Sequence, residues 1–253
     1  MNHKRALIFI VIFYLIHGSS ILCAETIILF GNQSKPPKAY FKDEKPAGIL
    51  VDIVKYAGEK MDINFEVHLV PWKRAQHQAL MGKGGIIGFA KTPKRQEEFE
   101  YAEYPMYIDE TLLITTKDNT FEFEDINDLE GKKIIQIRGA SHGKEFEQSV
   151  NKIFKLTEVN TNKRILQMLL GGRADVAIIN PGLASLRMVV ERHPSLLENK
   201  NKFVALKKPL GLTPNHLAFA KHMKMTKFLK HFSQVMKDGY DSGEIPKIIE
   251  RYN

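Results

Sequence analysis

The sequence predicts an α/β fold built from two units. Its 253 residues are 43% hydrophobic and 26% charged, which suits a globular chain with two modest cores. Short apolar stretches with strand character alternate with stretches of helical periodicity. The alternation begins near residue 26 and restarts after a polar segment at 125–131. Strands that alternate with helices favour a largely parallel sheet in each unit, flanked by helices.

The elements of the first unit are predicted from the spacing of apolar residues and from the proline and glycine residues that interrupt it. A β-rich run at 26–30 precedes a loop at 32–40, in which Pro36-Pro37 argues against regular structure. Apolar residues then recur at helical spacing over 49–61. The remaining elements expected here are a strand at 65–69, a helix at 72–81, a strand at 86–89, a helix that begins at Pro93, and a strand at 111–116.

The second unit repeats the pattern. Its strands are expected at 134–137, 156–159, 176–179, 203–206 and 216–220. Its helices are expected at 141–153, 162–170 and 181–191, and two further helices at 225–238 and 245–252 end the chain. Two α/β units in a chain of this length predict two lobes.

The segment Thr92-Pro93-Lys94-Arg95 carries the strongest candidate for a binding site. Thr is a preferred N-cap and Pro suits the first helical position, so a helix should begin here directly after a buried strand. Free backbone N–H groups beside the guanidinium of Arg95 suit a carboxylate. Thr92 is then a cap and a candidate donor to the ligand. The alternative is a surface arginine paired with Glu98.

Trp72 follows a strand end, where its ring offers a stacking surface to the same gap. The alternative for this tryptophan is a place in the core, the usual role of a large aromatic side chain. Arg74 lies two residues further along and is either a second cation of the site or an exposed helix arginine.

The net charge of +8 and the pI near 9.3 set limits on the partners. The basic residues are dispersed rather than interleaved with aromatic residues along one helix, so a nucleic-acid partner is not expected. They include Lys35, Lys38, Lys42, Lys91 and Lys94. The two interpretations are a solvated basic surface and the steering of anionic ligands into a cleft.

The N-terminus has the pattern of a secretory signal peptide. Lys4 and Arg5 precede an apolar run at 6–16, which is short for the ~20 residues that span a bilayer. Cleavage is expected after Ala24, which leaves a periplasmic chain with a net charge of +6 and no cysteine. The alternatives are an uncleaved anchor and a lipid-modified Cys23, which Ile21 and Leu22 disfavour.

Motifs of catalysis and of metal or phosphate binding are not found in the sequence. The nine histidines show no metal-ligand spacing, and neither Gly-x-Ser-x-Gly nor His-Glu-x-x-His occurs. The glycine-rich turn at 82–85 lacks the Lys-Ser/Thr ending of a phosphate loop. No metal and no cofactor are therefore expected.

Several short motifs, taken in order, carry a family resemblance. Besides Thr-x-x-Arg at 92–95, they are Pro36-Pro37 with Tyr40, Gly48 to Asp52, Leu129 to Lys133, Gly139-Ala140-Ser141 and Gly171 to Asp175. In this order and spacing the chain resembles family 3 of the solute-binding proteins of bacterial ABC transporters, the polar amino-acid-binding type. The resemblance covers nearly the whole chain after the signal peptide.

The resemblance implies a type II periplasmic-binding-protein fold: two lobes, each a sheet flanked by helices, joined by a two-strand hinge. It implies that residues 1–24 are the signal peptide, 25–116 form lobe 1, 117–207 form lobe 2, and 208–253 return to lobe 1. The ligand would lie between the lobes.

It also implies the roles of individual residues on the lobe 1 side. Arg95 would hold the ligand carboxylate, Trp72 would stack on the ligand, and Tyr40 would form the opposite wall. Ala90 stands where the family often has a hydroxyl residue.

On the lobe 2 side, Ser141 would meet the carboxylate, with Arg138 adding charge beside it. Asn180 stands where the family has an Asp for the ligand's α-amino group, unless it only caps the following helix. The carboxylate side is thus retained and the ammonium side is altered.

The leading hypothesis is a monomeric periplasmic protein that closes on a small carboxylate-bearing ligand and passes it to an inner-membrane ABC permease. One alternative is an enzyme on the same scaffold, similar to the dehydratases that act on cyclic carboxylates. Its general acid or base would be Glu110 or His142. Another alternative is a periplasmic ligand sensor that acts through a signalling partner.

Overall fold

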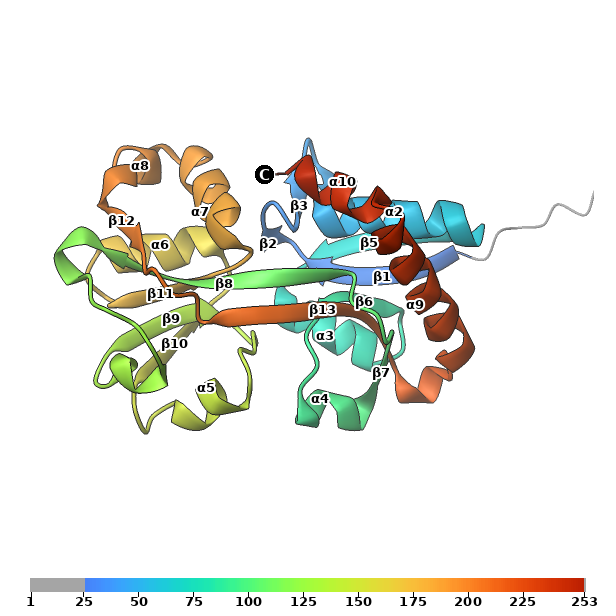
Figure 1. Ribbon diagram of the computed structural model, residues 1–253, viewed down its shortest axis with the longest axis horizontal. Coiled ribbons are helices and arrows are strands. Elements are labelled where there is room, and N and C mark those ends of the chain that lie inside the picture. The colour runs from blue at the N-terminus through green and yellow to red at the C-terminus, as the bar shows by residue number, and fades with distance from the viewer. Residues whose placement is uncertain (1–25, 253) are drawn as a thin grey trace, which may run out of the picture.

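The computed structural model describes residues 26–252 of the chain. The expected signal peptide, its cleavage after Ala24 and the lone Cys23 lie outside the described residues. Figure 1 shows two lobes side by side, with two long strands running from one lobe to the other. No helix within 26–252 is long and apolar enough to cross a membrane.

Lobe 1 is built on a parallel core of three strands. β1 (Thr26–Asn32) lies between β5 (Asn64–Val70) and β6 (Gly85–Phe89) and is parallel to both. The helices of this lobe are α2 (Ile49–Met61), α3 (Trp72–Leu80), α4 (Pro93–Glu98), α9 (Thr226–Asp241) and α10 (Glu244–Glu250). The C-terminal helices α9 and α10 pack on α2, far from them in sequence, and so complete this lobe.

Lobe 2 is smaller and has apolar clusters of its own. β9 (Lys133–Ile137) lies between β10 (Lys155–Val159) and β11 (Val176–Ile179), again all parallel. Its helices are α5 (Lys144–Ser149), α6 (Asn162–Leu170), α7 (Gly182–Glu191) and α8 (Pro194–Leu197). The shorter elements of the chain are β7 (Phe99–Tyr101), β12 (Phe203–Ala205) and 3₁₀ turns at Lys117–Asn119, Ile126–Leu129, Lys200–Lys202 and Lys221–Met223.

Two strands connect the lobes. β8 (Tyr107–Thr116) and β13 (Gly211–Ala220) pair with each other through 107–111 and 211–215. Beyond that segment β8 pairs with β11 and β12 of lobe 2, whereas β13 pairs with β6 and β7 of lobe 1. One ten-stranded mixed sheet therefore runs through both lobes, and the expectation of a largely parallel sheet was wrong at these antiparallel strands.

The strands expected at 111–116 and 216–220 are the apolar parts of β8 and β13. Their polar parts were missed because they carry residues such as Asp109 and Asn215, which sequence periodicity does not assign to a buried strand. Pairing between the two strands keeps them extended. The domain boundaries after 116 and 207 stay a prediction; the pairing partners change after Thr111 in β8 and after Asn215 in β13.

Two further elements differ from expectation. The loop expected at 32–40 contains β2 (Ser34–Lys35) and the start of β3 (Ala39–Lys42), which with β4 (Lys45–Ala47) form a three-stranded sheet. Pro36-Pro37 occupies the turn of this hairpin instead of excluding strands around it. The helix expected at 141–153 is only α5, because Gly143 before it, at φ 101°, and Val150 after it, at ψ 129°, lie outside helical backbone.

The return of the C-terminus to lobe 1 can be tested at Phe232, a fully buried side chain of α9. Phe232→Ala should lower the free energy of unfolding by about 3–5 kcal/mol, because it opens a cavity in a close-packed core. Urea denaturation measures this loss. Lys230→Ala on the exposed side of the same helix is the control, with a change within about 0.5 kcal/mol. Equal effects of the two substitutions would contradict the packing of α9 on lobe 1.

Candidate ligand-binding cleft

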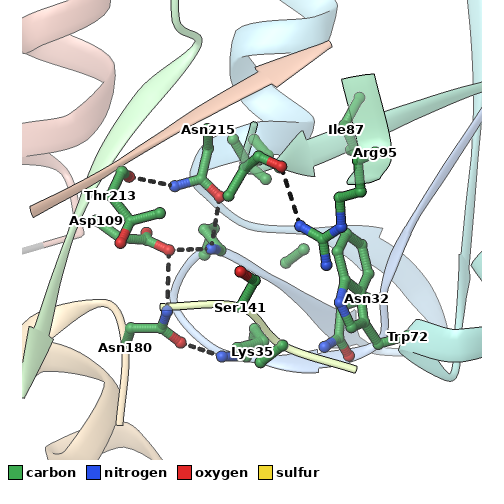
Figure 2. A pocket seen from close by; sticks show the side chains of 16 residues that line it. Asn32, Lys35, Trp72, Ile87, Arg95, Asp109, Ser141, Asn180, Thr213 and Asn215 are labelled. Atoms are coloured by element: carbon green, nitrogen blue, oxygen red, sulfur yellow. Dashed lines mark hydrogen bonds and ion pairs between the residues drawn. The ribbon is translucent and has the colours of Figure 1, made fainter. Parts of the chain in front are cut away.

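A cavity of about 50 Å³ lies between the lobes, next to the segment where β8 and β13 pair. Lobe 1 contributes Trp72, Ile87 and Arg95, and lobe 2 contributes Ala140, Ser141 and Asn180. The crossing strands contribute Asp109, Thr213 and Asn215. Residues from all three parts of the fold thus meet at one place (Figure 2).

Arg95 is held at this cavity by the start of α4. The predicted helix start is confirmed: Thr92 is the N-cap, its hydroxyl accepts a hydrogen bond from the Arg95 backbone N–H at 3.2 Å, and Pro93 follows it. The guanidinium lies over the Phe89 ring, 4.3 Å from its centroid, and donates to the carbonyl oxygen of Ala90 at 3.0 Å. Burial lowers the pKa of Arg95. The arginine is therefore oriented, with further N–H donors beyond those it uses within the protein.

The carbonyl oxygen of Gly139 receives three donors from lobe 1. Arg95 donates to it at 2.9 Å, and the indole of Trp72 and the amide of Gln76 donate at 3.2 Å each. Gly139 belongs to the turn after β9, in lobe 2. We call this arrangement the Gly139 contact. It ties the two lobes together beside the cavity, so Trp72 has a polar role as well as packing against Phe89.

A second polar group, the lysine cluster, consists of Lys35, Lys38, Asp109, Asn180 and Asn215. Lys38 forms an ion pair with the Asp109 carboxylate and donates to the Asn215 side-chain oxygen at 3.2 Å. Asn180 donates to the same carboxylate oxygen at 3.3 Å and accepts from the amine of Lys35. Figure 2 shows Asn180 linked to Asp109 above it and to Lys35 beside it. This cluster joins lobe 1, the crossing strands and lobe 2.

The hairpin of β2 and β3 places both lysines in the cleft. The first amides of α2, from Ile49 and Leu50, donate at 3.0 Å to the carbonyl oxygens of Pro37 and Lys38. Gly48 permits this approach, because a Cβ there would lie 2.5 Å from the Pro37 oxygen and φ is +118°. The turn is therefore fixed against the helix N-terminus.

The two lysine side chains are buried, with Lys35 7% and Lys38 6% exposed. For these two lysines the solvated-surface interpretation was wrong. Desolvation, followed by the charge of Lys38, lowers the pKa of Lys35 to about 7. The pKa of His142 falls to about 3 through burial and then through the charges of Lys35, Arg95 and Lys38. The cleft thus has a positive potential.

Five of the residues nominated from the sequence line the cavity: Trp72, Ala90, Arg95, Ser141 and Asn180. Their contact with a ligand stays a prediction. The hydroxyl of Ser141 donates to the carboxylate of Glu147.

The other nominated residues lie elsewhere. Tyr40 packs under the guanidinium of Arg192, 4.4 Å from the ring centroid, beside a separate cavity. Arg74 and Arg138 are exposed, and Thr92 acts as the helix cap. Glu110 and His142, the candidates for an enzyme, are not among the cavity-lining residues.

Sequence reasoning missed most of the lysine cluster as site residues. Lys35 and Lys38 were counted among the dispersed basic residues, and Asp109 and Asn215 precede the apolar parts of their strands. The one usable signal was the Lys-Pro-Pro-Lys motif at 35–38, since a rigid turn between two lysines holds both amines close together. In the described part of the chain, no group of three or more His, Cys, Asp and Glu side chains is placed to hold a metal ion.

Comparisons with known proteins agree with this architecture. The family model described as "Bacterial extracellular solute-binding proteins, family 3" matches residues 27–253. The probable amino-acid-binding protein YxeM of Bacillus subtilis (strain 168) is 23% identical over 222 residues, which cover 85% of this chain and 79% of that protein.

Two solved structures illustrate the similarity of fold. A histidine kinase sensor domain with similarity to periplasmic binding proteins superposes with a TM-score of 0.76 at 20% identity, covering 90% of this chain and 96% of that chain. An ancestral arginine-binding protein bound to arginine superposes with a TM-score of 0.74 at 18% identity, covering 90% of this chain and 97% of that chain. The chain therefore has the two-lobed fold of periplasmic binding proteins.

The lowered pKa of Lys35 predicts a specific pH dependence of stability. Between about pH 7 and the pKa of ~10.4 of an unfolded lysine, the unfolded chain binds a proton that folded Lys35 has lost. Stability should therefore rise with pH across this window, relative to Lys35→Met, by up to about 1.4 kcal/mol per pH unit. Denaturant unfolding of both proteins from pH 6 to pH 10 measures the difference. If the difference in unfolding free energy between the two proteins does not change with pH, the amine of Lys35 is solvated.

Proposed function

The chain belongs to family 3 of the bacterial extracellular solute-binding proteins, and we propose that it closes its two lobes on a small carboxylate-bearing ligand. The observation that carries this proposal is Arg95, an oriented guanidinium with further donors at a cavity between the lobes. A carboxylate matches the planar donor pattern of a guanidinium and forms strong charge-assisted hydrogen bonds with it. Trp72 and Ile87 supply apolar walls for the rest of the ligand.

Closure follows from the distribution of contacts over the two lobes. The Gly139 contact and the bond from Lys35 to Asn180 form only when the lobes meet. A ligand that touches Arg95 in lobe 1 and Ser141 in lobe 2 adds to the stability of the same closed state. The cavity of about 50 Å³ holds only a few water-sized groups, so an amino-acid-sized ligand fits between the closed lobes when the side chains of Lys35 and Lys38 move aside.

The surroundings of Asn180 argue against an ordinary α-amino acid as the preferred ligand. Its oxygen accepts from Lys35 and its NH₂ group donates to Asp109. A ligand ammonium placed beside Asn180 would meet a neutral amide and the cations Lys35 and Lys38, and the one carboxylate of the cavity wall, Asp109, is already paired with Lys38. We expect the ligand to be an acid whose second polar group is not basic.

Delivery of the ligand requires export and a membrane partner. The basic start and the short apolar run at 6–16 support secretion to the periplasm through a cleaved signal peptide. An ABC permease is the partner we propose, because the same fold occurs in the substrate binding protein of an amino acid ABC transporter. A sensor protein is the second candidate, since the same fold occurs in a histidine kinase sensor domain.

Arg95→Ala should weaken ligand binding by roughly 2–4 kcal/mol, or about 30- to 1,000-fold, through the loss of a charge-assisted contact. The ligand is first found by thermal shift against carboxylates and amino acids, where saturation at 100 times Kd adds ~2.7 kcal/mol of stability. Calorimetry then gives the affinity. Arg74→Ala, an exposed arginine on α3, is the matched control and should bind as the wild type does. If both variants retain full affinity, Arg95 is not the carboxylate site.

Ligand binding should also compact the protein in solution. Because the ligand bridges the lobes, saturating ligand shifts the population towards the closed state, and the radius of gyration decreases. Small-angle X-ray scattering with and without ligand measures this change. Superimposable curves at saturation would argue that the lobes stay fixed relative to each other and that signalling by closure is wrong.

A further inference from the structure

We propose that the ligand is a small dianion, with one carboxylate held by Arg95 and the second anionic group held by Lys35 and Lys38. This inference rests on the proposed function, because it assigns the other end of the same ligand. It goes beyond that function in naming the charge of the ligand and the residues that select it.

The first support is the charge of the cavity wall. Among the described residues that line the cavity, Lys35, Lys38 and Arg95 are basic, and Asp109 is the one carboxylate. Asp109 forms an ion pair with Lys38, so up to two positive charges have no protein counter-charge in the wall. A zwitterionic amino acid has no net charge and would leave that excess in place. A dianion neutralises it.

The second support is the position of Lys35. Its amine is buried and its hydrogen-bond partner is the neutral side-chain oxygen of Asn180. A buried ammonium is costly unless an anion is close to it. Lys38 comes from the same rigid turn, and Asn215 and Asp109 hold its amine at the cavity. An anionic group between the two lysines would accept hydrogen bonds from both.

The third support is the effect of these cations on their neighbours. Lys35, Arg95 and Lys38 each contribute to the lowered pKa of His142, and Lys38 contributes to that of Lys35. Burial is the larger cause of both shifts, and Asp109 partly offsets the effect of Lys38 on Lys35, so the neighbouring cations add to the effect of burial. An entering anion would reverse this effect and favour the charged form of Lys35.

One observation favours a zwitterionic ligand instead of a dianion. The second carboxylate oxygen of Asp109 is buried and has no hydrogen-bond partner in the described structure. A ligand ammonium or hydroxyl could donate to it. If an ammonium does so, the ligand is a zwitterion, and a neutral amino acid will bind more tightly than a diacid.

The test compares matched ligands on the full mature protein. Calorimetry measures the affinities of succinate and glutarate and of their monoamides, succinamate and glutaramate. Each monoamide replaces one carboxylate of its diacid with a neutral group of similar shape. L-glutamine represents a zwitterionic ligand without net charge, and L-arginine represents a ligand with a net positive charge. Because the monoamide loses one charged hydrogen bond, we expect at least one diacid to bind roughly 10- to 150-fold more tightly than its monoamide.

Variants then assign the second group to the lysine cluster. Lys35→Met should weaken diacid binding by a similar factor and leave monoamide binding nearly unchanged, so the preference for the diacid is lost. Lys42→Met, exposed on β3 of the same hairpin, is the matched control and should keep the preference. Circular dichroism and the unfolding midpoint verify that each variant is folded.

The pH dependence gives an independent readout. Lys38, Asp109, His142 and Arg95 are the titratable or charged groups around Lys35. A bound anion raises the pKa of Lys35 above its value of about 7 in the free protein, so binding takes up a proton. Diacid affinity should fall as pH rises above 7 in the wild type, and this fall should be absent in Lys35→Met.

The outcomes separate this inference from the proposed function. Equal affinities for diacids and monoamides, or tighter binding of L-glutamine or L-arginine, would overturn the dianion while leaving an Arg95-dependent carboxylate site intact. Loss of the diacid preference in Lys42→Met as well would overturn the role of Lys35. If no diacid binds saturably, the dianion is rejected. An Arg95→Ala variant with unchanged affinity would reject the proposed carboxylate site itself.

Discussion

The antiparallel pairing of β8 with β13 is the constraint on which the rest of this structure depends. Residues 107–111 and 211–215 are held extended by each other, and beyond this segment each strand continues into a different lobe. The pairing therefore joins two apolar cores and leaves the polar side chains of the crossing segment at the boundary between them. Asp109 and Asn215 reach the cleft in this way, from strands about 100 residues apart in the chain.

The burial of positive charge in the cleft lowers the stability of the folded protein. Lys35 is desolvated against a neutral amide, and Lys38 is balanced by Asp109 through an ion pair that also involves Asn180 and Asn215. Buried charges of this kind add little to stability by themselves, because desolvation offsets much of the attraction. A positive, water-poor surface is instead suited to binding an anion, since each contact there is stronger than in water.

The same residues link binding to the relative position of the lobes. Arg95 contacts both the Ala90 carbonyl of lobe 1 and the Gly139 carbonyl of lobe 2. Trp72 and Gln76 donate to that same Gly139 oxygen. Under the proposed function, a ligand at Arg95 joins a network that connects the two lobes, and its binding energy would favour closure.

The sequence by itself determined the elements whose stability is local: the amphipathic helix α2, the helix α6, the buried strand β11, and the Thr92 cap that orients Arg95. In each, the apolar period or the capping chemistry is contained in a few neighbouring residues. Only the tertiary structure decided that the polar segments of β8 and β13 are strands, and that Lys35 and Lys38 are buried against Asp109 and Asn180. These features depend on partners 70 or more residues away, whose proximity no local pattern of the sequence encodes.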